Sequence, residues 1–283
     1  MTKRIGIAAL VLLGALTPLV GSAATATADY AMFKRSIAPT YAWGENGVLT
    51  IPKAQPIGRY NLYGAASGFD AGSIQGEKVY NTKATFVLGT SEDVEIGYTK
   101  NQLIWNNGDR TDLDADVFHL KARILNLSEY FLPQISIGTV GVSMRQNQFT
   151  SSSSVLFNPF LVATSRIPLF TESAILSLTV DAEQIYLNGE ATSTFYNAGI
   201  DLSLFDEVLI VAAEVQGAGK KNADPIVNVA ARIKLFEVLS VGAGQYNMTK
   251  GAYDARVPGS SAYFVGFVAL QLPLGDWTGE GRE

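Results

Sequence analysis

The only histidine in the 283-residue chain, His119, is the first residue to examine for catalysis. Many hydrolases need a histidine next to a nucleophile or an acid. His119 stands between Phe118 and Leu120, and no Ser–His motif lies nearby. Its expected face also carries Lys121 and Arg123, and two neighbouring cations would not make it a strong base. We therefore expect an ordinary interior histidine and a protein that is not an enzyme.

Charged side chains recur at alternate positions within apolar segments. Alternate residues of a strand share one face, so Lys121 and Arg123 lie together, as do Asp181 and Glu183. With His119 as a neutral member, the candidates for a lumen lining are Arg59, Lys83, Glu95, Lys121, Arg123, Arg166, Asp181, Glu183, Asp201, Glu214, Arg232 and Lys234. Most of these basic residues lie between residues 59 and 167, and most of the acidic ones lie between 174 and 217. If the side chains line a pore, this separation would set an electric field across it. The alternative is that these charges pair across a narrow lumen and plug it.

Metal and thiol chemistry find little support in the sequence. The chain has no cysteine, which excludes disulfides, thiol catalysis and cysteine-based metal sites. The acidic stretch Asn106–Asp116 offers oxygen atoms to Ca²⁺, but its spacing does not match an EF-hand. We expect a solvated loop there, with no metal and no cofactor.

The elements that position these side chains are strands, as the stretch Asn197–Gln216 illustrates. Apolar residues, among them Ile200 and Leu202, fall at every second position on both sides of a short break at Phe205–Glu207. This pattern is typical of a hairpin whose strands have one apolar and one polar face. In a soluble sandwich the polar face meets water. In a transmembrane barrel the apolar face meets lipid and the polar face lines the lumen.

The start of the chain predicts export. Lys3 and Arg4 precede an apolar run from Ile5 to Val20, and small residues with Ala-x-Ala spacing follow as far as Ala28. Residues 1–28 therefore have the pattern of a secretory signal peptide. Its removal leaves 19 of the 21 basic residues against 26 acidic ones, a formal charge of −7. That balance argues against nucleic acid as a partner.

Apolar residues make up 47% of the chain, yet after the signal no apolar run approaches the ~18 residues of a membrane helix. Twelve alternating segments follow Gly58 instead. They span 59–68, 79–89, 94–104, 116–126, 134–145, 156–167, 174–186, 193–204, 208–217, 226–235, 238–246 and 261–272. Connections after even-numbered segments are short, whereas those after odd-numbered segments are mostly longer and polar. This sorting favours an all-β, up-and-down antiparallel transmembrane β-barrel of about 12 strands in residues 58–283, with long loops outside the cell.

Residues 29–57 precede the expected barrel and are irregular, because Pro39, Pro52 and Pro56 interrupt any strand. They would form either a plug of the lumen or a periplasmic extension. Within them, Gly47–Ala54 resembles the opening of some bacterial outer-membrane barrel proteins, including a family linked to exopolysaccharide secretion. The resemblance implies an outer-membrane barrel and assigns no functional residue.

The sequence leaves three functions open. The first is a passive pore for small polar solutes or ions in the bacterial outer membrane. The second is a non-conducting structural or assembly barrel associated with envelope polysaccharide export. The third, a soluble secreted sandwich, is disfavoured by the sorted loops and apolar faces. The expected partners are outer-membrane lipids and the outer-membrane assembly machinery, with a homo-oligomer as an open alternative.

Overall fold

The computed structural model describes residues 47–48, 51–74, 77–105, 111–127, 132–144, 154–169, 173–218, 225–236, 238–246 and 263–274. The chain divides into two compact units, and all described residues belong to the larger one, residues 36–283. Residues 1–35, and with them the predicted signal peptide, lie outside the described residues. In the described part of the chain, no helix is long and apolar enough to cross a membrane.

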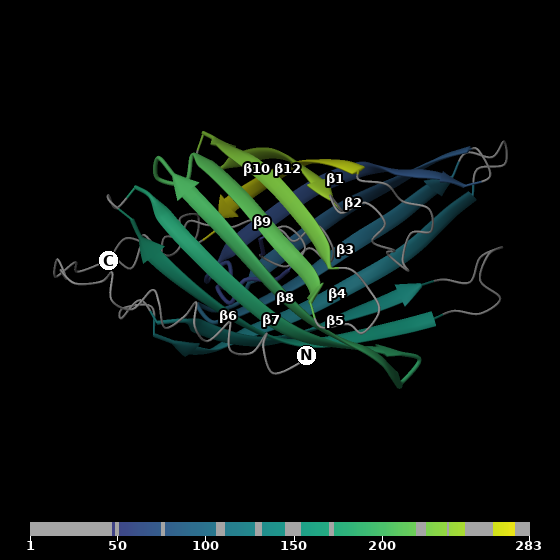
Figure 1. Cartoon of the computed structure of the whole chain (residues 1–283), viewed down its shortest axis with the longest axis horizontal. Coiled ribbons are helices and arrows are strands. Elements are labelled where there is room, and N and C mark those ends of the chain that lie inside the picture. Colours follow the sequence, from purple (N-terminus) through teal and green to yellow (C-terminus); the bar gives the residue numbers. More distant parts are fainter. Residues whose placement is uncertain are drawn as a thin grey trace. The chain divides into compact units, whose positions relative to one another are not determined.

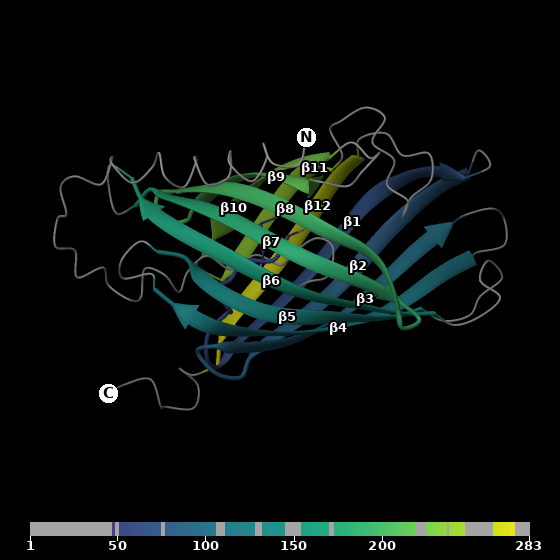
Figure 2. The ribbon, with the colours of Figure 1, turned by 60° about the horizontal axis from the view of Figure 1, so that its bottom comes forward.

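Twelve antiparallel strands close into one barrel (Figure 1). They are β1 (Asn61–Ile74), β2 (Glu77–Gly89), β3 (Val94–Trp105), β4 (Thr111–Asn126), β5 (Gln134–Met144), β6 (Ser154–Pro168), β7 (Ile175–Leu187), β8 (Glu190–Leu204), β9 (Leu209–Ala218), β10 (Ile226–Leu235), β11 (Leu239–Tyr246) and β12 (Tyr263–Pro273). Each strand pairs with its neighbours in the chain, and β12 closes the ring by pairing with β1. Figure 2 shows β12, in yellow, beside β1, in blue. The predicted up-and-down barrel of twelve strands is confirmed.

Burial alternates along the strands, as a repeat of two residues requires. On β9, Ile210 and Ala212 are buried, whereas Val211 between them is 47% exposed. On β8, Asp201 is 1% exposed and its neighbour Ile200 is 44% exposed. In a closed membrane barrel the exposed apolar side chains face lipid, and the buried set faces inward. The polar faces therefore line the interior.

Three stretches expected to be connections are largely strand. Of residues 69–78 and 187–192, only 75–76 and 188–189 lie between strands, so the connections β1–β2 and β7–β8 are shorter than expected. The expected acidic loop Asn106–Asp116 is part of β4 from Thr111 onward, and residues 106–110 lie outside the described residues. Lys100 on β3 lies 3.2 Å (Nζ to Oδ2) from Asp114 and 3.3 Å (Nζ to Oδ1) from Asp116, both on β4. Cross-strand pairs of opposite charge stabilise the pairing of β3 with β4. The polar sequence of this stretch alone predicted a loop.

The connections after even-numbered strands lie at one end of the barrel, termed the short-turn end. Those after odd-numbered strands lie at the other end, termed the long-loop end, although β1–β2 and β7–β8 are joined there by only two residues each. Between β8 and β9, three consecutive residues, Phe205, Asp206 and Glu207, have φ of 56°, 56° and 69°. Such left-handed conformations are uncommon for residues other than glycine. Val208 N donates to Phe205 O (3.2 Å) within this turn. The turn leaves Phe205 exposed and Glu207 buried, which adds a carboxylate to the interior.

Inside the barrel, glycines make room for rings on the paired strand. A Cβ added to Gly138 would lie 2.3 Å from Phe160 Cζ, and one added to Gly97 would lie 2.1 Å from His119 Cε1. Each glycine directly opposes that ring residue in the ladder. The rings of His119 and Phe160 therefore occupy the space that a side chain at Gly97 or Gly138 would need.

Candidate functional site

Residues Ile51–Gly58, termed the inner segment, lie between the barrel walls. All eight are buried, and Ile51 and Ala54 are 0% exposed. Pro52 and Pro56 lack the N–H group that a sheet ladder needs, so the inner segment does not join the wall as another strand. At its start, Val48 N donates to Ile51 O (2.9 Å). Its contacts are with inward side chains of the strands.

An ion pair fixes the inner segment to β8. Lys53 Nζ lies 2.9 Å from Asp201 Oδ2, and these side chains are 4% and 1% exposed. Burial lowers the pKa of Lys53, because desolvation disfavours the ammonium, while the Asp201 carboxylate opposes that shift. On β9, Glu214 Oε2 accepts a hydrogen bond from Ile51 N (3.3 Å), and its Oε1 accepts one from Asn228 Nδ2 (2.7 Å). Carboxylates of the wall therefore bind the inner segment directly.

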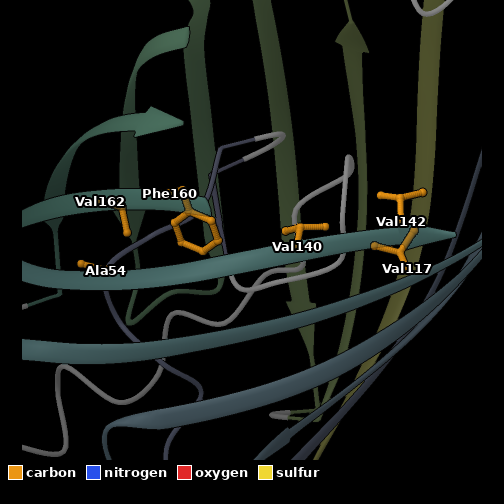
Figure 3. Packing of buried hydrophobic residues seen from close by; sticks show 6 residues of the cluster. All are labelled: Ala54, Val117, Val140, Val142, Phe160 and Val162. Atoms are coloured by element: carbon orange, nitrogen blue, oxygen red, sulfur yellow. The ribbon is translucent and has the colours of Figure 1, made fainter. Parts of the chain in front are cut away.

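Ala54 is held from two further strands. Its N–H donates to Thr164 Oγ1 on β6 (2.9 Å), and its carbonyl accepts a short hydrogen bond from Ser136 Oγ on β5. Its methyl group belongs to an apolar cluster on the inner wall. Figure 3 shows this cluster, which comprises Ala54, Val117, Val140, Val142, Phe160 and Val162. Both main-chain polar groups of a fully buried residue are thus satisfied by the wall.

Arg166 on β6 links the inner segment to the β8–β9 turn. Its Nη1 donates to Gln55 Oε1 (3.4 Å), and its Nη2 lies 2.9 Å from Glu207 Oε1. The side chains of Arg166 and Glu207 are each 4% exposed. The left-handed turn that buries Glu207 therefore supplies the carboxylate for an ion pair with Arg166.

Glu95 on β3 anchors the other end of the inner segment. Its Oε2 accepts a hydrogen bond from Ile57 N (2.9 Å), and its Oε1 lies 2.8 Å from Lys121 Nζ. His119 Nε2 lies 3.8 Å from Glu95 Oε1, too far for a hydrogen bond, and neither ring nitrogen has a hydrogen-bond partner. In a ring of twelve strands, β3 lies six positions from β9, where Glu214 binds Ile51. The inner segment therefore contacts opposite walls.

A second polar group lies on β6, β7 and β8, nearer the long-loop end. Asn197 Nδ2 donates to Asp181 Oδ1 (2.7 Å) and to Glu183 Oε1 (2.6 Å). Glu183 Oε2 accepts a short hydrogen bond from Asn158 Nδ2. Asn197 Oδ1 accepts a hydrogen bond from Gly217 N (2.9 Å), which fixes the orientation of this amide. Two carboxylates are thus held together by neutral amides.

The structure brings some of the predicted lumen residues together and not others. Glu95 joins Lys121, and Arg166, Asp201 and Glu214 meet the inner segment or its partners. Arg232 is buried, Arg123 pairs with Asp93 (2.6 Å), Lys83 and Lys234 are half-buried, and Arg59 is exposed beside Tyr60. Their role in a pore stays a prediction.

Sequence reasoning missed several residues of this arrangement. They are Lys53, Ser136, Asn158, Thr164 and Glu207. Lys53 carried a usable signal, because a lysine between two prolines in a segment able to enter the lumen needs a carboxylate there. Glu207 carried none, since it sits in a turn whose left-handed backbone the sequence does not reveal.

No protein-family model and no curated protein matches the chain. Among solved structures, the KdgM porin in complex with disordered oligogalacturonate is similar, with a TM-score of 0.47 and 10% identity over 74% of this chain and 98% of that one. LpxR from Salmonella typhimurium is similar with a TM-score of 0.46 and 11% identity, over 74% and 99%. The chain is an outer-membrane β-barrel protein. Its predicted location in the bacterial outer membrane is confirmed.

The inference from a single histidine that the protein is not an enzyme does not hold, because the fold does not exclude catalysis. Outer membrane phospholipase A from Escherichia coli is also similar, with a TM-score of 0.43 and 11% identity over 84% of this chain and 97% of that one. The expectation depended on a single histidine, but catalysis is a property of a site, and other side chains can also act as acids, bases or nucleophiles.

Proposed function

We propose that the protein is a pore for small polar solutes or ions, and that the inner segment closes its lumen in the state described. The observation that carries the proposal is the inner segment itself. Eight consecutive buried residues contact β3 on one wall and β9 on the opposite wall. A solute that crosses the barrel would have to displace them.

The chemistry of these contacts favours a closed pore over a barrel that is solid throughout. Barrels of ~8 strands are filled by side chains of their own wall, whereas twelve strands enclose more space. Here that space holds a separate part of the chain, bound largely through polar wall groups such as Asp201, Thr164 and Glu95. Water can replace such contacts when the segment leaves, because each of these wall groups hydrogen-bonds to water equally well.

The inner segment has one covalent connection to the wall within the described residues, at Gly58, where it leads into β1. Glu95 and Asn61 bind it close to that point, since Asn61 Nδ2 donates to Ile57 O (3.0 Å). Lys53 and Ile51 are bound further away, on β8 and β9. We therefore infer that opening begins with separation of Lys53 from Asp201 and ends with rotation about Gly58, whose φ is +84°.

Conductance in planar lipid bilayers tests this function. The native protein should conduct weakly, and deletion of residues 47–56 should give larger and steady single-channel currents. Lys53→Ala should give brief openings, because the ion pair to Asp201 is lost. Lys100→Ala, which removes a lysine paired on β3–β4 instead, is the matched control and should behave as the native protein does.

The alternative outcome is equally specific. If the deletion variant folds and still does not conduct, the pore proposal fails. The protein is then better described as a non-conducting structural or assembly barrel associated with envelope polysaccharide export. Assembly by the outer-membrane machinery and formation of a homo-oligomer stay predictions in both cases.

A further inference from the structure

One row of residues on the outer wall is aromatic except at its middle position. The row follows direct ladder partners from β3 to β7, namely Tyr98, Phe118, Gly141, Phe157 and Tyr186. The ring centroids of Tyr98 and Phe118 lie 5.1 Å apart, and those of Phe157 and Tyr186 lie 6.3 Å apart. Tilted aromatic pairs at such distances attract each other. Each phenylalanine therefore packs against the tyrosine on the side away from Gly141.

Gly141 faces outward and leaves open space between the two phenylalanines. Its neighbours along β5, Val140 and Val142, belong to the apolar cluster on the inner wall (Figure 3), so position 141 points to the other face. A Cβ added to Gly141 would meet no atom within 4 Å. The rings of Phe118 and Phe157 beside it are 59% and 47% exposed. These three residues form a notch in the outer wall, termed the Gly141 notch.

Elsewhere on the outer face a phenylalanine covers the glycine that it opposes. Gly64 on β1 follows the buried Tyr63 and directly opposes Phe86 on β2. A Cβ added to Gly64 would lie 3.8 Å from Phe86 Cδ1. Gly141 has a phenylalanine on each side, and neither ring covers it, since each packs against a tyrosine instead. The packing of the aromatic row therefore keeps the Gly141 notch open.

The Gly141 notch lies where the outer face changes from polar to apolar. Toward the long-loop end, the next outward position on β5 is Ser143, which is exposed and directly opposes Asp116. Asp116 Oδ1 lies 3.3 Å from Lys100 Nζ and accepts a hydrogen bond from Tyr98 OH (2.6 Å). Toward the short-turn end the exposed side chains on these strands are apolar, namely Leu120, Ile137 and Leu161. A lipid has the same order, with a polar headgroup followed by hydrocarbon.

We propose that the Gly141 notch binds one acyl chain of a phospholipid, whose headgroup lies at the level of Ser143 and Asp116. The outer face around the notch meets lipid in a membrane barrel, so the notch continues that interface. Lipid tails are as apolar as the wall, and van der Waals packing therefore selects the site. A chain in the notch contacts a ring on each side and the backbone of β5 beneath it. Because the notch is on the outer face, its occupant does not depend on whether the lumen opens.

Native mass spectrometry of the delipidated full-length protein, titrated with dimyristoylphosphatidylethanolamine in detergent, tests the proposal. The native protein should retain one lipid under conditions in which further lipids dissociate. Gly141→Leu should weaken that binding at least about fivefold, since the leucine fills the space in which the chain makes its contacts. Gly266→Leu is the matched control. Gly266 is an exposed glycine on β12 whose added Cβ also meets nothing within 4 Å, but its ladder partners are Gly68 and Ala243, so Gly266→Leu should bind as the native protein does.

Three results would overturn the proposal. The first is a native protein that retains no lipid, and the second is equal lipid binding by Gly141→Leu. The third is a native dimer that Gly141→Leu converts to a monomer in the same spectra, since a second copy would then fill the notch. Heat-modifiable mobility on gels shows whether each variant folds. If Gly141→Leu does not fold, Phe157→Ala decides by removing one side of the notch: weaker lipid binding supports the proposal, and unchanged binding overturns it.

Discussion

The two halves of the lumen hold their inward carboxylates differently. Toward the short-turn end, Glu95 is 2.8 Å from Lys121, and Asp201 is 2.9 Å from Lys53. Toward the long-loop end, Glu183 has amide partners within the described residues. In the first arrangement each of these two carboxylates has a lysine as its counter-charge. Glu183 is only half-buried, so the two halves differ in how far they shield a carboxylate from water.

The largest expected difference in the free energy of unfolding is between two variants that each neutralise one carboxylate, one in each half of the lumen. Glu95→Gln removes the carboxylate that Lys121 and Ile57 both use, and breaking a buried ion pair typically destabilises by about 3–5 kcal/mol. Glu183→Gln should destabilise far less, because Glu183 is half-buried and its hydrogen bonds within the described residues come from neutral amides. Urea unfolding in lipid vesicles, followed by tryptophan fluorescence, measures both. Equal losses would remove the distinction between the halves.

The next effect tests whether the faces of the wall are assigned correctly. Ile200 is 44% exposed on the outer face of β8, next to the inward Asp201. Arginine at the bilayer midplane of a barrel costs about 2–4 kcal/mol and little near the interfaces. Ile200→Arg should therefore impair folding, whereas Ala191→Arg, at an exposed position next to the first residue of β8, should not. Heat-modifiable mobility on gels reports the folded fraction, and equal folding of both variants would contradict the assignment.

These comparisons depend partly on what alternation alone predicts. The two-residue repeat of polar and apolar side chains predicts which of them face inward, such as Asp201 and Glu214, because successive side chains of a pleated strand point to opposite faces. It does not predict partners. The Lys53–Asp201 and Glu95–Ile57 contacts join residues 148 and 38 positions apart in the chain, and only the closed ring brings them together. Proline spacing predicted that residues 29–57, which include most of the inner segment, would not form a continuous strand, but gave no position for them inside the lumen.

A smaller effect comes from crowding the inner segment without changing its charges. A Cβ on Gly199 of β8 would lie 2.7 Å from Ile51 Cδ1 and 3.1 Å from Val48 Cγ2. Gly199→Ala should destabilise the barrel by about 1–3 kcal/mol, or push the segment aside and raise conductance. Gly141→Ala is the matched control, because a Cβ there meets nothing within 4 Å. If both variants behave alike in bilayer recordings and in unfolding, the inner segment is not tightly seated against β8.

The smallest effect is expected for an ion pair that the interior does not enclose. Lys100 lies 3.2 Å from Asp114 and 3.3 Å from Asp116, and its side chain is 27% exposed. Pairs of this kind contribute about 0–1 kcal/mol, because water and salt screen them. Lys100→Ala should therefore lower the free energy of unfolding by no more than that, and the loss should shrink further at high salt. The contrast with Glu95→Gln isolates burial, since both variants remove one partner of a lysine–carboxylate pair between β3 and β4. A loss for Lys100→Ala as large as that for Glu95→Gln would mean that the two ion pairs are equally shielded from water.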